Sequence, residues 1–171
     1  MLRGLMALGL LAVMLVGCGS GSPAGLSLEL EPQADFEAET YTFTASGEAV
    51  DDGVMCDSGA WIWVGNETAD GEAMPASMIE EMVQAGDDFT MVVVNEFACE
   101  DGSGSIVVAE QSTIDASNPA YTDPGARVGT WVVRSGSING DRIEGGGDVI
   151  GGGDMQVSGQ QSRLEGNLTR D

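Results

Sequence analysis

Short segments in which apolar and polar residues alternate, separated by glycine-rich turns, recur along most of the chain. Residues 26–31 and 40–45 alternate strictly, which places every second side chain on one face of a half-buried strand. Twenty-six of the 171 residues are glycine, a residue typical of tight turns and strand bends. The pattern therefore predicts an all-β domain, an antiparallel β-barrel or, as the alternative, a β-sandwich.

Further strands are expected along the rest of this domain, about nine or ten in all. The dipeptide Asn139-Gly140 is typical of a type I′ hairpin turn, residues 100–105 form the turn of another hairpin, and residues 48–53 form an acidic turn. The expected strands lie near residues 55–56, 61–64, 89–98, 106–109, 128–134, 143, 149–150, 155–157 and 164–168.

One segment alone has the pattern of a helix. Residues 77–80 have the form of a capping box, with Ser77 as N-cap and Glu80 three residues later. Apolar residues then follow at helical spacing, and Gly86 can end the helix. The sequence therefore predicts one short helix at 77–85.

The N-terminus has the organisation of a signal peptide. Residues 5–16 are apolar apart from Gly9, a run shorter than the roughly 20 residues that a membrane-spanning helix needs. The sequence Leu15-Val16-Gly17-Cys18 resembles the lipobox of bacterial lipoproteins. The resemblance implies cleavage between Gly17 and Cys18 and acylation of Cys18, and an ordinary secretory signal with a chance cysteine is the alternative.

Three regions are therefore expected. Residues 1–17 form a signal peptide, residues 18–25 a lipid-anchored flexible tether, and residues 26–171 a single acidic β domain. The lipid on Cys18 makes the membrane a partner, because buried acyl carbons contribute about 0.8 kcal/mol per CH₂. The expected location is the outer face of the cell membrane, or the outer membrane if the source has one.

Two cysteines, Cys56 and Cys99, remain after Cys18. In an exported domain such a pair indicates a disulfide. A redox or metal-binding pair is the alternative, but the chain has no CxxC motif and no histidine. We therefore predict a structural disulfide between Cys56 and Cys99.

The charge of the chain is strongly negative. After residue 17, the 28 acidic residues face five arginines, a formal charge of −23. Such a surface repels phosphate groups, so we expect no nucleic-acid partner. The alternatives are that the charge keeps a glycine-rich β protein soluble or that it attracts cations and basic partners.

The absence of histidine and lysine excludes several kinds of active site. Without them there is no Ser-His-Asp triad, no Cys-His dyad, no Schiff-base lysine and no zinc site with histidine ligands. A pair of carboxylates acting as acid and base remains possible in principle. The sequence assigns no catalytic residue, no metal ligand and no cofactor.

Acidic clusters and a glycine repeat are the candidate calcium sites of the sequence. The GGGD repeat at 145–148 and 151–154 lacks the nine-residue period of calcium-binding β-helices, and glycines that bend strands explain it better. No EF-hand pattern occurs. Weak calcium binding stays an alternative, with candidate ligands Asp51, Asp52, Asp57, Asp87, Asp88 and Asp101.

The aromatic residues cluster at Tyr41, Trp61, Trp63 and Trp131. Trp61 and Trp63 are two residues apart, so they share one face of a strand. An outer face could stack on a sugar or another flat ligand, whereas an inner face belongs to the core. The core is the favoured interpretation because few other large apolar residues could fill a barrel.

Three segments, 54–59, 97–105 and 129–137, resemble a family of small secreted actinobacterial proteins of unknown function. They correspond to its Cys-Ser-Gly turn, its Phe-x-Cys-x-Asp-Gly-Ser-Gly hairpin and its Gly-x-Trp-x-Val strand. An aromatic residue usually follows the last segment, where this chain has Ile138. The resemblance implies an antiparallel barrel similar to allene oxide cyclases and dirigent proteins, and a paired Cys56 and Cys99, but no activity.

The sequence thus indicates a lipid-anchored, extracytoplasmic β-barrel with a non-enzymatic binding or envelope-structural role and an unidentified ligand or protein partner. One alternative is a small barrel enzyme that acts on a hydrophobic ligand with carboxylates as acid and base. The other is a weak calcium-binding surface protein.

Overall fold

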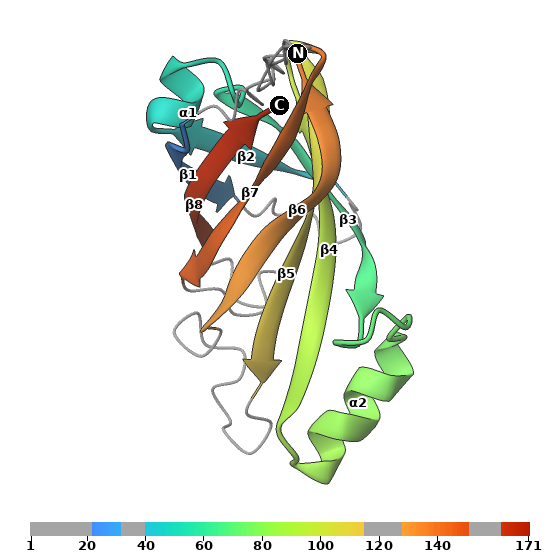
Figure 1. The fold of residues 1–171 in the computed structure, drawn as a ribbon. Helices are drawn as coiled ribbons and strands as arrows, with labels where there is room; N and C mark the ends of the chain where they lie inside the picture. Colours follow the sequence, from blue (N-terminus) through green and yellow to red (C-terminus); the bar gives the residue numbers. More distant parts are fainter. Residues whose placement is uncertain (1–21, 32–39, 115–127, 151–161) are drawn as a thin grey trace, which may run out of the picture.

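Eight antiparallel strands form a closed barrel in the computed structural model, which describes residues 22–31, 40–114, 128–150 and 162–171 (Figure 1). Each strand pairs with its neighbours in sequence, and β1 pairs with β8 to close the ring. The predicted barrel is confirmed, and the β-sandwich alternative is wrong. The strands are β1 (Ala24–Glu31), β2 (Thr40–Ser46), β3 (Ser58–Glu67), β4 (Phe89–Cys99), β5 (Gly104–Ile114), β6 (Val128–Ile138), β7 (Asp141–Ile150) and β8 (Ser162–Arg170).

The alternating pattern separates the inside of the barrel from the outside. On β1, Leu26, Leu28 and Leu30 are buried, while Ser27 and Glu29 face outward. The same alternation on the other strands gives one continuous core, because successive side chains of a strand point to opposite faces. Its largest fully buried members include Phe43, Phe97, Met55, Ile106, Ile138, Ile143, Leu164 and Leu168.

The two ends of the barrel differ. The helix α1 (Glu48–Asp51) and the hairpin turns β4–β5 and β6–β7 lie at one end, which we call the α1 end. The helix α2 (Ala76–Ala85) lies at the other, the α2 end, between β3 and β4 (Figure 1). β4 and β5 stay paired as far as Phe89 and Ile114 toward the α2 end, whereas the pairing of β2 with β3 begins only at Ile62.

The segment before β3 differs from the prediction. Residues 48–51 form the helix α1 instead of a turn, and residues 55–56 form no strand. The carbonyl oxygen of Ala49 accepts hydrogen bonds from the N–H groups of Val54 and Met55. These bonds wrap the chain around α1, so Met55 fills the core without joining the sheet.

Helix α2 confirms the one predicted helix but not its cap. The helix begins at Ala76 with Pro75 as N-cap, and no side chain caps it, so the prediction of Ser77 as N-cap is wrong. The carbonyl oxygen of Pro75 accepts the N–H of Met78, so the N-cap lies two residues before Ser77. Gly86 ends it in the left-handed conformation, as predicted. No helix of the described residues is long and apolar enough to cross a bilayer.

Two boundaries and one glycine run are also informative. β1 begins at Ala24, so residues 24–25 of the expected tether belong to the barrel. The short strands expected separately around 143 and 149–150 form one continuous strand, β7, which runs through three consecutive glycines. A Cβ on Gly147 would lie 1.9 Å from the carbonyl oxygen of Glu165 on β8, so only glycine allows this close approach of the two strands. The second GGGD run, 151–154, and the expected strand at 155–157 lie outside the described residues.

The predicted disulfide between Cys56 and Cys99 is confirmed. It joins the segment after α1 to the end of β4, with a Cα–Cα distance of 5.8 Å. It therefore closes the α1 end by tying two connections that are 43 residues apart in sequence.

We predict that the double substitution Cys56→Ser and Cys99→Ser lowers the free energy of unfolding by about 2–4 kcal/mol, because it releases a long loop in the unfolded chain. Chemical denaturation measures the change. A reducing agent should destabilise the wild-type protein by a similar amount and leave the double variant unaffected. Equal stability of the wild-type protein and the variant would contradict a structural role.

Candidate functional site

Four buried polar side chains lie on the inner face of β3, β4 and β5. Trp61, Asn95, Glu110 and Ser112 expose 5%, 2%, 5% and 1% of their surface. Among the described residues, the last three are the only polar or charged side chains, tryptophan and tyrosine aside, that are buried to this degree. We call these four residues the inner polar row.

The strand register places the row along the barrel interior toward the α2 end. Asn95 lies opposite Trp63 on β3 and Val108 on β5. Glu110 and Ser112 follow Val108 at every second residue of β5, so they share its inner face. From the level of Asn95 to that of Ser112 is four residues, or about 13 Å along a strand.

A short hydrogen bond links the middle of the row. Nδ2 of Asn95 donates to Oε1 of Glu110 at 2.7 Å, and both side chains are buried. A bond to a carboxylate in a poorly solvated place is stronger than a neutral one. Glu110 also has a further interaction partner. The carboxylate is therefore engaged, and it orients the Asn95 amide.

Three atoms of the row have no hydrogen-bond partner. They are Nε1 of Trp61, Oδ1 of Asn95 and Oγ of Ser112, and each is removed from solvent. Leaving such a group unsatisfied costs about 1–3 kcal/mol. Three buried polar atoms without partners on adjacent strands are unusual in a region that serves packing alone. Such unsatisfied groups often mark a functional site.

Aromatic side chains lie beside the row, with Trp131 on β6 opposite Glu110. Tyr41 stacks on Trp61 with ring centroids 4.4 Å apart. Trp131 is buried, and its Nε1 donates to the carbonyl oxygen of Glu165 at 3.1 Å. The predicted core role is therefore confirmed for these three residues. It is wrong for Trp63, which is 42% exposed because β3 continues past the last residue that pairs with β2.

The sequence pattern missed Asn95, Glu110 and Ser112. The strand expected at 89–98 contains Asn95 without marking its amide as a site residue, and the strand expected at 106–109 ends before Glu110 and Ser112. β5 in fact continues to Ile114. The sequence does contain a signal for Glu110 and Ser112. They continue the every-second-residue spacing of the apolar residues Ile106, Val108 and Ile114, which places all five side chains on the same face of β5.

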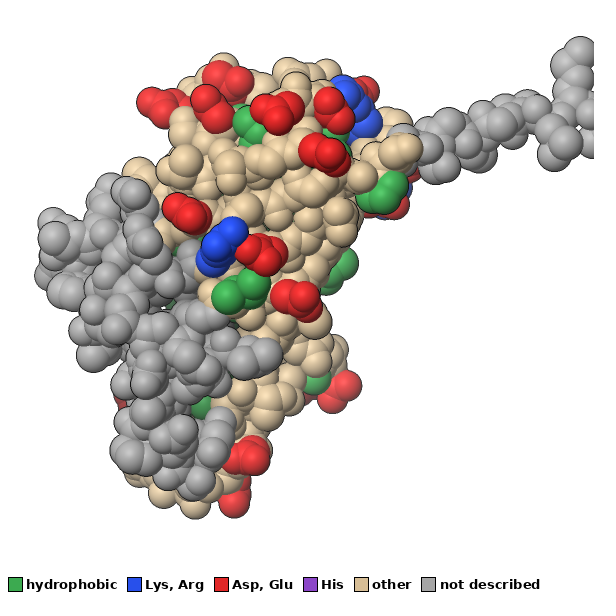
Figure 2. All heavy atoms as spheres, turned by 90° about the vertical axis from the view of Figure 1, so that its left-hand side faces the viewer, with side chains coloured by type: hydrophobic (Ala, Val, Ile, Leu, Met, Phe, Trp, Pro, Cys, Tyr) green, Lys and Arg blue, Asp and Glu red, His purple; other side chains and the backbone are tan. Residues whose placement is uncertain are grey.

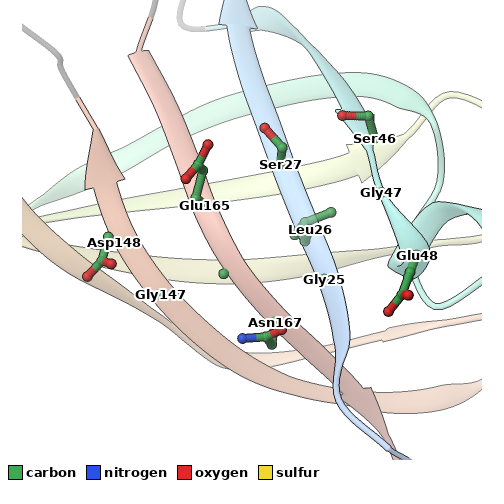
Figure 3. Close-up of a pocket in the computed structure, with 11 residues that line it drawn as sticks. Gly25, Leu26, Ser27, Ser46, Gly47, Glu48, Gly147, Asp148, Glu165 and Asn167 are labelled. Carbon is green, nitrogen blue, oxygen red and sulfur yellow. The ribbon is translucent and has the colours of Figure 1, made fainter.

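A hollow lies on the outside of the barrel, over β7, β8, β1 and the end of β2 (Figure 3). It has a volume of about 470 Å³ and is open to solvent. Gly25 and Gly47 place no side chain in it, and Asp148, Glu165 and Ser27 line it from three successive strands.

The charges of this outer groove are partly balanced. Asp148 lies directly opposite Glu165, an arrangement that is unfavourable between like charges. Arg163 compensates it through an ion pair of 2.7 Å with Glu165 and a hydrogen bond from its Nε to Oγ of Ser27. Among the described residues that line the groove, none has a buried polar side-chain atom without a partner, so the groove does not by itself indicate a ligand.

The acidic residues proposed as calcium ligands are exposed. Figure 2 shows acidic side chains gathered at the top of the molecule, which is the α1 end. The backbone N–H of Ser103 donates to Oδ1 of Asp101 at 2.9 Å and lowers the pKa of this carboxyl. Among the described residues, no three or more acidic, histidine or cysteine side chains form a group that could hold a metal ion. The candidates Asp51, Asp52, Asp57, Asp87 and Asp88 are likewise on the surface.

Cys18 and Gly17, the predicted lipidation and cleavage residues, lie outside the described residues. Comparison with known proteins adds no assignment: no protein-family profile, curated protein or solved structure matches this chain. The inner polar row is therefore identified from its own geometry.

We predict that Ser112→Ala leaves the free energy of unfolding unchanged or raises it by up to about 1 kcal/mol, because the hydroxyl that it removes has no partner in the barrel. Chemical denaturation compares it with Ser135→Ala, an exposed serine on β6 that should change stability by less than about 0.5 kcal/mol. A clear loss of stability in Ser112→Ala alone would show that the hydroxyl supports the fold.

Proposed function

We propose that this protein is a lipid-anchored binding protein of the cell envelope that takes a small ligand into the barrel from the α2 end. The observation that carries the proposal is the inner polar row, three of whose atoms are buried without partners. These protein atoms are already removed from water, so a ligand that supplies the missing hydrogen bonds does not have to displace water from them. Trp63, exposed and opposite Asn95, lies where such a ligand would enter.

The place where the barrel begins supports this orientation. β1 starts at Ala24 beside the end of β8, at the α1 end. A tether from Cys18 to Ala24 has six peptide units and spans at most about 20 Å. Lipid on Cys18 would therefore hold the α1 end near the bilayer and turn the α2 end outward.

A second candidate is a small barrel enzyme acting on a hydrophobic ligand. The observation that favours it is Glu110, a buried carboxylate that accepts a hydrogen bond from Asn95. A carboxylate in such a place is suited to proton transfer. The binding role is preferred because the three atoms that lack partners belong to Trp61, Asn95 and Ser112, which bind a ligand but do not exchange protons at neutral pH.

For the anchor, we predict that Cys18→Ser prevents acylation and moves the protein from the membrane to the soluble fraction of cells. Mass spectrometry of the N-terminal peptide and fractionation measure the two effects. Ser20→Ala is the matched control in the same segment and should remain in the membrane. Membrane retention of a Cys18→Ser protein from which residues 1–17 have been removed, as the N-terminal peptide shows, would contradict a lipid anchor on this residue.

For binding, we predict that the chain from residue 22 onward, which contains all eight strands, binds N-phenylnaphthylamine saturably. This dye is neutral, apolar and flat, and its emission rises when water is excluded. A fluorescence titration that reaches one dye per protein is the expected result. A linear, non-saturating signal would contradict a binding site within the barrel.

A further inference from the structure

We infer that the ligand of the inner polar row is a neutral, elongated and largely apolar molecule that carries hydrogen-bonding groups at separate points along its length. This inference rests on the binding function proposed above and specifies the ligand. Three features of the site support it: the kind of groups left without partners, the state of the one buried charge, and the arrangement of the row.

The unsatisfied groups are uncharged and of mixed type. Oδ1 of Asn95 accepts hydrogen bonds, Nε1 of Trp61 donates one, and the hydroxyl of Ser112 does both. A ligand that matches them carries a donor for Asn95 and an acceptor for Trp61. An ionised group would find no vacant counter-charge among these three atoms, and burying it there would be costly.

The charge inside the barrel disfavours ionic ligands as well. Glu110 is the only buried charged side chain of the described residues, and it already accepts the amide of Asn95 and has another partner. A cation would have to compete for an engaged carboxylate. An anion would meet this carboxylate and the field of a chain with a formal charge of −22.

The length of the row sets the shape of the ligand. Asn95 and Ser112 are about 13 Å apart along the strands, and Val93 and Met91 of β4 lie between and beside them on the same face. At the other end, Trp61 and Tyr41 form an aromatic stack. A flat ring against the aromatic residues and an apolar body along β4 and β5 would fit this arrangement.

Matched dyes test the neutrality of the ligand. Anilinonaphthalenesulfonate has the rings of N-phenylnaphthylamine and one added negative charge. Phenylnaphthalene has the same rings but lacks the N–H donor. We expect the neutral amine to bind at least about tenfold more tightly than the sulfonate, and at least about threefold more tightly than phenylnaphthalene, which loses one hydrogen bond. Equal affinities for the amine and the sulfonate would overturn the neutral-ligand inference.

Variants test whether the row makes the contact. Asn95→Leu should weaken the binding of N-phenylnaphthylamine about threefold to tenfold and leave phenylnaphthalene unaffected. Because Asn95→Leu also removes a partner of Glu110 and could impair folding, Ser112→Ala serves as the second variant. For a longer probe, a hydroxyl-terminated N-phenylnaphthylamine derivative, Ser112→Ala should reduce affinity by a similar factor. Ser135→Ala should leave every affinity unchanged.

The outcomes separate the two proposals. If no dye binds the wild-type barrel saturably, the proposed binding function fails and the ligand class fails with it. If the dyes bind but neither Asn95→Leu nor Ser112→Ala changes any affinity, the binding function stands and the assignment to the inner polar row is overturned. If the sulfonate binds as well as the amine, the site stands and the neutral ligand is overturned.

Discussion

The pairing of β1 with β8 is the interaction on which the rest of the structure depends. Without it, two strands would present rows of unpaired backbone groups to solvent, and the leucines of β1 would lose their packing against those of β8. Closure also fixes which face of each strand is inside, because the register of one pair is transmitted around the ring. The buried position of every residue of the inner polar row follows from this closure.

Closure does not make the two ends of the barrel equivalent. At the α1 end, the Cys56–Cys99 disulfide, the helix α1 and two tight hairpins join the strands with short connections. At the α2 end, β4 and β5 continue beyond the level at which β2 pairs with β3. The longer strands carry the inner polar row, and Trp63 is left exposed beside it. The short, disulfide-linked connections thus lie at the α1 end, whereas Asn95, Glu110 and Ser112 lie toward the α2 end, an arrangement typical of a scaffold that carries a site.

Much of the fold follows from local pattern, and the errors have physical causes. Alternation identified β1, β2 and the hairpins, and the Asn139-Gly140 turn has both residues at positive φ, as its type requires. The strand breaks expected at the glycines of β7 are absent, because hydrogen bonds from both β6 and β8 keep the strand continuous. Residues 55–56 have the pattern of a strand, but the N–H of Met55 bonds to Ala49 of α1 instead of to a neighbouring strand. Of the candidate site, the sequence pattern identifies only Trp61, because the burial of Asn95 and Glu110 depends on strands that are far away in sequence.

The sequence by itself determined the class of structure and the pairing of its cysteines. Period-two alternation and turn-forming glycines act over a few residues, so they can be recognised without knowledge of the fold. Once Cys18 is set aside, the two remaining cysteines have only one pairing to make. Tertiary structure alone decided that the sheet closes as a barrel, that Trp63 is exposed while Trp61 is buried, and that Asn95 meets Glu110 from the next strand. These outcomes depend on register and strand length across the whole ring, and no local stretch of sequence encodes either.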